Sequence, residues 1–196
     1  MVMARRLLLL GLSCSGFFLY LLINRLPRNE VVAHRIHVGL DGLIPLVPIF
    51  SVPYALAMVF VVGTLAYFVL FTPRVRETAY SYTFCLAVSC ATYLAFQTTV
   101  DRPPVDANSA FTGLVSFIYA NDQPYNCFPS LHVSLTVLAS LIWARGRRRL
   151  AVPLAGWVVL VALSTLFTKQ HVLLDVLAGA VLGGASFWVG AALSDP

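Results

Sequence analysis

Two short polar clusters lie where a loop gives way to an apolar segment, in a chain with only 11% charged residues. They are Pro-Ser-Leu-His at 129–132 and His-Val-Leu-Leu-Asp at 171–175. Ionisable side chains at a membrane boundary are energetically costly, so they are candidates for a functional site by default. Two histidines and a carboxylate are the residue types needed for acid, base and nucleophilic catalysis.

His171 and Asp175 are four residues apart, which is the spacing of two side chains on one face of a helix. A carboxylate on Nδ1 of His171 would fix its tautomer and leave Nε2 as a basic lone pair. A buried histidine and aspartate that only satisfy each other's hydrogen bonds would have the same spacing. The pair by itself leaves both interpretations open.

The Pro129 cluster has the pattern of a helix start, because proline suits the first turn of a helix and serine suits its cap. Free backbone N–H groups at such a start, together with the Ser130 hydroxyl, form a site for an anion. His132 lies on the first turn, where it can give a proton to a group that leaves the anion. An ordinary capped helix with an interfacial histidine has the same pattern.

Arg102 is followed by two prolines, which restrict the backbone beside it. Its planar guanidinium can donate two parallel hydrogen bonds to phosphate oxygens. The alternative is an arginine that extends from the membrane to the interface. The polar segment Gln97–Phe128, which contains Arg102, is expected to form the lid or wall of a site.

The elements that must position these residues are membrane-spanning helices. The chain is 59% apolar and its mean hydropathy is +0.84, both outside the range of soluble domains. A span needs about 20 residues, so six spans fill most of the chain, and we expect one all-α domain over residues 1–196, an integral membrane bundle of six transmembrane helices. The six apolar segments are Leu7–Ile23, Val47–Thr72, Thr78–Phe96, Ser130–Ala144, Leu150–Phe167 and His171–Leu193.

Two parts of this layout have alternatives. The first apolar segment follows Arg5 and Arg6, as a signal peptide would, but no small-x-small cleavage site follows, which favours a retained helix. The segment Arg25–Pro45 mixes Val31, Val32 and other apolar residues with histidines, so we expect an interfacial helix or loop after the first span.

Basic residues predict the orientation, because Lys and Arg in short loops concentrate on the cytoplasmic side. Eight fall on one side and five on the other: Arg5, Arg6, Arg74, Arg76, Arg145, Arg147, Arg148 and Arg149 against Arg25, Arg28, Arg35, Arg102 and Lys169. We therefore expect a multi-pass protein of the cell membrane with both termini cytoplasmic and the active site on the extracytoplasmic side. Membrane lipids are the expected surroundings, and no nucleic acid is expected as a partner because no basic stripe carries interleaved aromatic residues.

Together, the three motifs resemble the signature of the type 2 phosphatidic acid phosphatase superfamily, which is Arg-Pro, then Pro-Ser-x-His, then His-x-x-x-Asp. The resemblance implies that His171 is a nucleophile that forms a phosphohistidine, with Asp175 orienting it. It implies that His132 is the general acid for the leaving group and then the base for the acceptor. It also implies that Arg102 and Ser130 bind phosphate oxygens, and that neither a metal nor another cofactor is needed.

The chain departs from the family's fuller pattern at two cations. Ala95 stands where the family has a Lys, and Ser-Thr at 164–165 stands where it has Ser-Arg. Lys169 is the expected replacement for one cation, and Gln97 is a possible neutral donor. Leu131 completes the set of expected phosphate-binding positions, and its place in the motif is similar to the inositolphosphotransferase-like branch.

The sequence thus predicts a lipid phosphatase that hydrolyses a lipid phosphate monoester or pyrophosphate on the extracytoplasmic face, through a phosphohistidine and without a metal. The alternative is a lipid phosphotransferase of the same fold that passes a phosphoryl headgroup, for example inositol phosphate, to a lipid alcohol. A transporter is disfavoured because the ionisable residues gather at the ends of the spans rather than at the midplane. The sequence leaves the lipid and the oligomeric state open.

Overall fold

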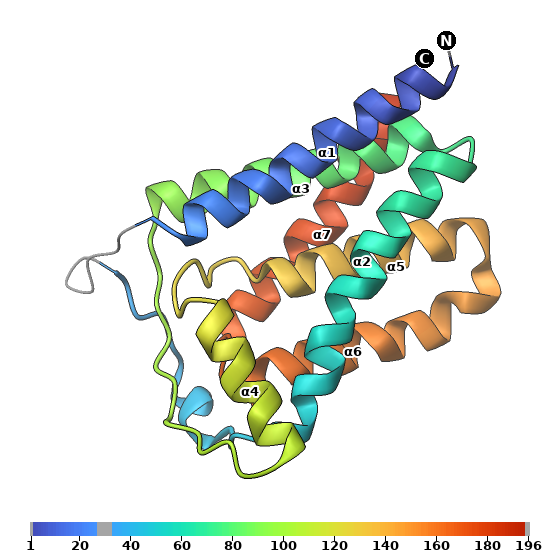
Figure 1. The fold of residues 1–196 in the computed structure, drawn as a ribbon. Helices are drawn as coiled ribbons and strands as arrows, with labels where there is room; N and C mark the ends of the chain where they lie inside the picture. Colours follow the sequence, from blue (N-terminus) through green and yellow to red (C-terminus); the bar gives the residue numbers. More distant parts are fainter. Residues whose placement is uncertain (1, 27–32, 195–196) are drawn as a thin grey trace.

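The protein is described by a computed structural model that covers residues 2–26 and 33–194 (Figure 1). These residues form helices, short 3-10 turns and two isolated β-bridges, and they contain no β-strand, so the all-α prediction is confirmed. The α-helices are α1 (Val2–Asn24), α2 (Ser51–Phe71), α3 (Val75–Ala95), α4 (Ala110–Asn121), α5 (Leu131–Gly146), α6 (Ala151–Phe167) and α7 (Leu173–Ser194).

Four stretches of the described chain are long and apolar enough to cross a membrane, by length and composition. They are Met3–Asn24, Pro48–Phe71, Arg148–Phe167 and Leu173–Ser194. The two other predicted spans correspond to α3 and to the 16-residue helix α5. The arrangement is compatible with a multi-pass membrane protein, and the number of six spans stays a prediction.

Helix α7 packs against both α3 and α5 through small residues. A Cβ atom on Gly179 would lie 2.6 Å from the backbone oxygen of Ser130, and one on Gly190 would lie 2.7 Å from the backbone oxygen of Glu77. Glycine therefore allows the helix backbones to approach closely, as is common between membrane helices. This packing brings the first turn of α7 beside the first turn of α5.

The apolar side chains form a core inside the bundle and an apolar coat outside it. The core is built from α2, α3, α5 and α7, with residues such as Val61, Leu86, Leu135 and Ile142 fully buried. Large apolar residues are exposed along the outer faces, for example Leu8, Val59, Val159, Val181 and Trp188. Such a surface is unfavourable in water and suits contact with lipid.

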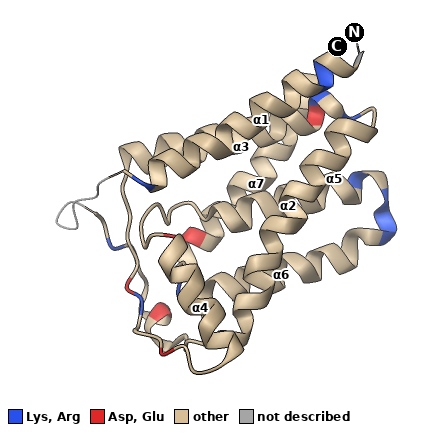
Figure 2. Cartoon of the chain, viewed as in Figure 1, with Lys and Arg blue, Asp and Glu red and all other residues tan. Residues whose placement is uncertain are grey.

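The two ends of the bundle differ in their connections and charges. Both termini lie at one end, together with the α2–α3 and α5–α6 connections (Figure 1). Figure 2 shows most of the Arg residues at this end, whereas most of the acidic residues lie at the opposite end, near α4 and the long loops, together with a smaller number of basic residues. The segregation agrees with the basic-residue pattern used to predict the orientation.

The predicted interfacial segment Arg25–Pro45 lies partly outside the described residues, which exclude Arg28, Val31 and Val32. Its described part contains a 3-10 turn at Gly39–Leu43 and no α-helix. It runs beside residues 97–99, where the His34 amide donates to the Gln97 carbonyl (2.8 Å) and the Thr99 amide donates to the His34 carbonyl (3.0 Å). The segment is thus a loop tied across the end of the bundle.

The predicted polar loop Gln97–Phe128 contains a helix, α4, which the sequence analysis did not expect. Ser109 caps this helix, since its side chain accepts a hydrogen bond from the Thr112 amide at 3.2 Å. Val115 and Ile118, three residues apart, are buried on one face of α4. Packing of that face against the bundle stabilises a helix of only 12 residues, which would be marginal in isolation.

Candidate active site

The first turn of α5 has the capped start that the sequence predicted. Ser130 is the N-cap, and its Oγ accepts a hydrogen bond from the Val133 amide at 3.4 Å. The Ser130 amide donates to the backbone oxygen of Asp175 at 3.0 Å, which joins the starts of α5 and α7. His132 follows on the first turn, and its ring stacks on Tyr54 of α2 with centroids 4.1 Å apart.

His171 precedes helix α7, which begins at Leu173, whereas the predicted span began at His171. Nδ1 of His171 lies 3.3 Å from Oδ2 of Asp175, so the expected contact is present. The same oxygen accepts the Val172 amide at 3.0 Å, as a carboxylate in the first turn does when it caps a helix. The pair therefore meets because Asp175 reaches back over the helix start, and not because both lie on one helical face.

The turn between α6 and α7 fixes the position of His171. The amides of Gln170 and His171 both donate to the Thr165 carbonyl, at 3.0 and 3.2 Å. Lys169 adopts a positive φ of 55°, which reverses the chain direction within this turn. Asp41 of the α1–α2 loop accepts the Leu173 amide at 2.8 Å, so the loop also caps α7.

His132 and His171 line the same small cavity, whose volume is about 10 Å³. Their ring centroids are 6.5 Å apart. The predicted site residues that line this cavity are Arg102, Leu131, His132 and His171. Asp175 lies directly behind His171 and is fully buried. Tertiary packing thus unites motifs that are about 30 to 70 residues apart in the sequence.

Arg102 is held as a rigid fork on the wall of this cavity. Its Nη1 donates to the Asp122 carbonyl at 2.6 Å, and its Nη2 donates to the Gln123 carbonyl at 3.2 Å and to Oε1 of Gln170. The guanidinium also lies over the Tyr119 ring at 4.8 Å. The buried Nε has no hydrogen-bond partner among the described residues, so it can donate to a ligand.

Two predicted phosphate-binding residues do not line this cavity. Ser130 is fully buried, and its Oγ is engaged as the cap of α5. Nζ of Lys169 donates to the carbonyls of Asp41 (3.4 Å) and Ile44. Gln97, the other suggested replacement, accepts the His34 amide through its backbone carbonyl and also does not line the cavity.

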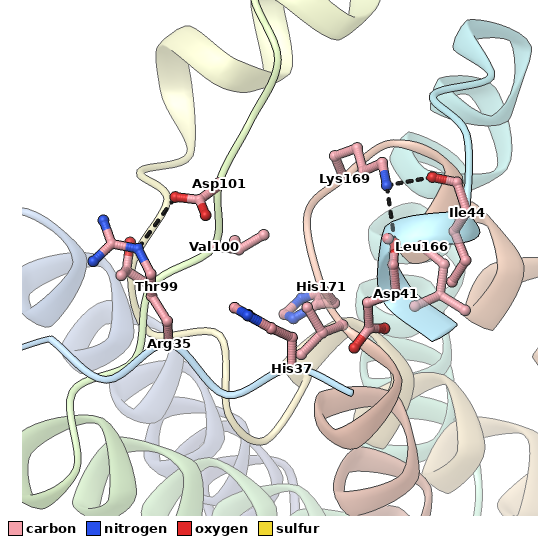
Figure 3. A pocket seen from close by; sticks show the side chains of 12 residues that line it. Arg35, His37, Asp41, Ile44, Thr99, Val100, Asp101, Leu166, Lys169 and His171 are labelled. Carbon is pink, nitrogen blue, oxygen red and sulfur yellow. Dashed lines mark hydrogen bonds and ion pairs between the residues drawn. The ribbon is translucent and has the colours of Figure 1, made fainter. Parts of the chain in front are cut away.

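Lys169 instead borders a second, larger cavity of about 240 Å³, and His171 forms part of its wall as well. Figure 3 shows this cavity, which is lined by His37 of the α1–α2 loop and by His171 of the α6–α7 turn. Arg35 forms an ion pair with Asp101 at its edge, with Nε and Oδ1 3.2 Å apart. Because Arg35 and Asp101 are both exposed, this ion pair contributes little to stability. His171 thus separates a small inner cavity from a wider outer one.

Asp122 also lines the inner cavity. The sequence analysis included this residue only as part of the polar segment Gln97–Phe128. Its carboxylate accepts hydrogen bonds from Tyr20 (3.3 Å), Asn24 (3.2 Å) and Tyr54 (3.0 Å). Because the Tyr54 ring stacks on His132, Asp122 also fixes the surface against which this histidine rests. The sequence carried no motif for Asp122, since its partners come from α1 and α2.

One group within the described residues could offer three ligand atoms to a metal ion: Cys127, His171 and Asp175, whose atoms lie within 4.8 Å of one another. Burial raises the pKa of the Cys127 thiol well above its usual range, Asp175 raises it further, and Arg102 opposes this. A raised pKa disfavours the thiolate that binds metals. Nδ1 of His171 is already paired with Asp175, so the geometry fits an acid–base dyad better than a metal centre.

The comparison with protein families matches residues 76–195 to the PAP2 superfamily. The match covers more than half of the chain and runs from α3 to α7, so it includes Arg102 and both histidines of the cavity. No curated protein and no solved structure matches the chain.

Proposed function

Because the chain belongs to the PAP2 superfamily, we propose that it is a membrane lipid phosphatase that acts through a phosphohistidine on His171. Members of this superfamily are phosphatases. The observation that carries the proposal is the pair of imidazoles 6.5 Å apart across a cavity, one of them bound to a buried carboxylate. Both rings line one narrow pocket, so a phosphoryl group that enters it would lie next to a nucleophile and a proton donor.

In the first step, Nε2 of His171 attacks phosphorus, and a P–N bond forms as the P–O bond to the lipid alcohol breaks. His132 gives its proton to the departing oxygen, so that the product leaves as an alcohol. Asp175 holds the proton on Nδ1 of His171 and stabilises the positive charge that develops on the ring. Arg102 balances the charge on the phosphoryl oxygens.

In the second step, a water molecule takes the place of the departed alcohol. His132, now neutral, accepts a proton from this water as it attacks phosphorus. The P–N bond breaks, inorganic phosphate leaves, and both histidines return to their starting forms. No step in this scheme requires a metal ion, since the two histidines and Arg102 supply the nucleophile, the proton transfer and the positive charge.

The test is turnover of phosphatidic acid, an isoprenyl pyrophosphate and phosphatidylinositol by the detergent-purified protein with EDTA present. We expect phosphate release that is lost in His171→Ala, together with an acid-labile phosphoenzyme in the wild type. His34→Ala is a matched control, because His34 stacks on Phe96 outside both cavities. Normal turnover by His171→Ala would refute the mechanism.

A second candidate is a phosphotransferase that passes the phosphoryl headgroup to a lipid alcohol. The charge of the inner cavity favours this candidate. Arg102 is the one Lys or Arg among the described residues of its wall, and a single cation matches a phosphoryl group that carries a headgroup ester and therefore one negative charge. The chemistry as far as the covalent intermediate is the same, and only the acceptor differs. Headgroup transfer to an added lipid alcohol with little free phosphate would establish this candidate in place of hydrolysis.

The proposed orientation puts both termini in the cytoplasm and the active site on the extracytoplasmic side of the cell membrane. The support is the basic end of the bundle seen in Figure 2, because Lys and Arg concentrate in cytoplasmic loops. The inner cavity lies toward the other end, near α4. The orientation can be tested by placing a single cysteine in the α5–α6 connection and treating intact cells with a thiol reagent that does not cross the membrane. We expect no labelling, and labelling from outside the cell would reverse the proposed orientation.

A further inference from the structure

Gln170 is a buried side chain, 2% exposed, that borders the inner cavity beside His171. Its Oε1 accepts a hydrogen bond from Nη2 of Arg102. Because arginine has donors and no acceptor, this contact fixes which way the amide points. Nε2 of Gln170 therefore faces away from the guanidinium contact, and it has no hydrogen-bond partner in the described part of the chain.

Two unpaired N–H donors thus belong to neighbouring side chains of one cavity wall: Nε2 of Gln170 and Nε of Arg102. Leaving a buried donor without an acceptor costs free energy, so almost all such groups in proteins are paired. A ligand with several acceptor oxygens would pair both donors at once. A phosphoryl group between His132 and His171 has such oxygens.

The charge of the cavity wall favours one class of phosphoryl group. Arg102 is its one Lys or Arg among the described residues, and Asp122 contributes a carboxylate to the same wall. Nζ of Lys169 is bound to backbone carbonyls of the α1–α2 loop. An amide donates hydrogen bonds without adding positive charge, so this wall suits one negative charge better than two.

We propose that Gln170 is a substrate-binding residue that selects a phosphoryl group with a single negative charge, as in a phosphate diester. Nε2 of Gln170 donates to one non-bridging oxygen and Nε of Arg102 to another, while Oε1 of Gln170 holds the guanidinium in place. A diester carries a second ester group where a monoester has a third charged oxygen. After one ester of such a diester is lost, the other stays on phosphorus, so this selectivity favours the phosphotransferase candidate over release of inorganic phosphate. The assignment rests on the proposed function, because it takes the cavity between the two histidines as the phosphoryl site.

The test is equilibrium binding of two simple anions to the detergent-purified full-length protein at pH 8. Dimethyl phosphate carries one negative charge, and methyl phosphate carries two because its second pKa is about 6. Titration calorimetry should give the wild type at least equal affinity for dimethyl phosphate. Gln170→Leu, which removes the donor and the acceptor, should weaken its binding by about tenfold or more.

Gln170→Glu separates donation from positioning. Glutamate keeps an acceptor for Arg102, so the loop retains its structure, but it lacks the donor and adds a negative charge. We expect it to weaken binding of both anions, and of methyl phosphate more. The matched control is Asn121→Leu, since this exposed amide donates to the Phe117 carbonyl within α4 and lies outside the inner cavity. It should bind as the wild type does.

Wild-type affinity in Gln170→Glu would overturn the donor role, because a residue that only positions Arg102 tolerates this change. Tighter wild-type binding of methyl phosphate than of dimethyl phosphate would overturn the charge selection. Absence of binding of either anion to the wild type would overturn both. The readout needs no turnover, so loss of the proposed activity and loss of this binding site are distinguishable.

Discussion

The close packing of α7 on α5 predicts that two adjacent glycines respond in opposite ways to substitution by alanine. A Cβ atom on Gly183 would lie 2.9 Å from Cβ of Val137 and closer still to the backbone oxygen of Ser134. A Cβ atom on Gly184, one residue later, would meet nothing within 4 Å. A carbonyl inside a helix cannot rotate aside, so Gly183→Ala must push the two helices apart.

The magnitude follows from two opposing effects. Alanine in place of glycine stabilises a helix interior by roughly 0.5–1 kcal/mol. Overpacking of a closely packed interior costs about 1–3 kcal/mol. Gly184→Ala experiences only the first effect, whereas Gly183→Ala experiences both. The difference in unfolding free energy between the two variants is therefore the overpacking cost itself, and for a chain of this size each kcal/mol shifts Tm by about 2–4 °C.

The assay is thermal unfolding of both variants and the wild type in the same detergent, followed by circular dichroism. We expect Gly183→Ala to unfold at a lower temperature than the wild type, and Gly184→Ala at an equal or higher one. Equal unfolding temperatures for the two variants would refute the argument that α7 approaches α5 through Gly183.

Three further predictions concern the loops and one ion pair. Because burial raises the pKa of the Cys127 thiol, it stays protonated at neutral pH; alkylation by iodoacetamide should be slow in the folded protein, accelerate only at alkaline pH, and be fast after denaturation in SDS. Asp41→Ala removes the acceptor of the Leu173 amide, so the α1–α2 loop should become more sensitive to proteolysis, with a loss of about 1 kcal/mol in stability. Glu77→Gln removes the ion pair to Arg145 (2.9 Å) between α3 and α5; Tm should fall by an amount worth roughly 1 kcal/mol, and an unchanged Tm would contradict this role.

The helical class could be predicted from the sequence because apolar segments near span length have few alternatives in a membrane. The start of α5 was also predictable, since Pro129 and Ser130 are local signals that act within one turn. Helix α4 was not, because a single short helix in a polar segment depends on packing against distant elements. The same applies to the α1–α2 loop, whose pairing with residues 97–99 joins segments far apart in the chain.

The three motifs predicted which residues would carry the chemistry, because the reactivity of histidine, aspartate and arginine depends on residue type. Tertiary structure decided how these residues meet. Asp175 contacts His171 by reaching back over a helix start, and Lys169 donates to the carbonyls of a loop. The acceptor of Gln170 is paired with Arg102, and its donor has no partner among residues 2–26 and 33–194. A sequence pattern specifies residue types and local periodicity, whereas hydrogen-bond partners depend on the three-dimensional approach of segments that have no fixed sequence separation.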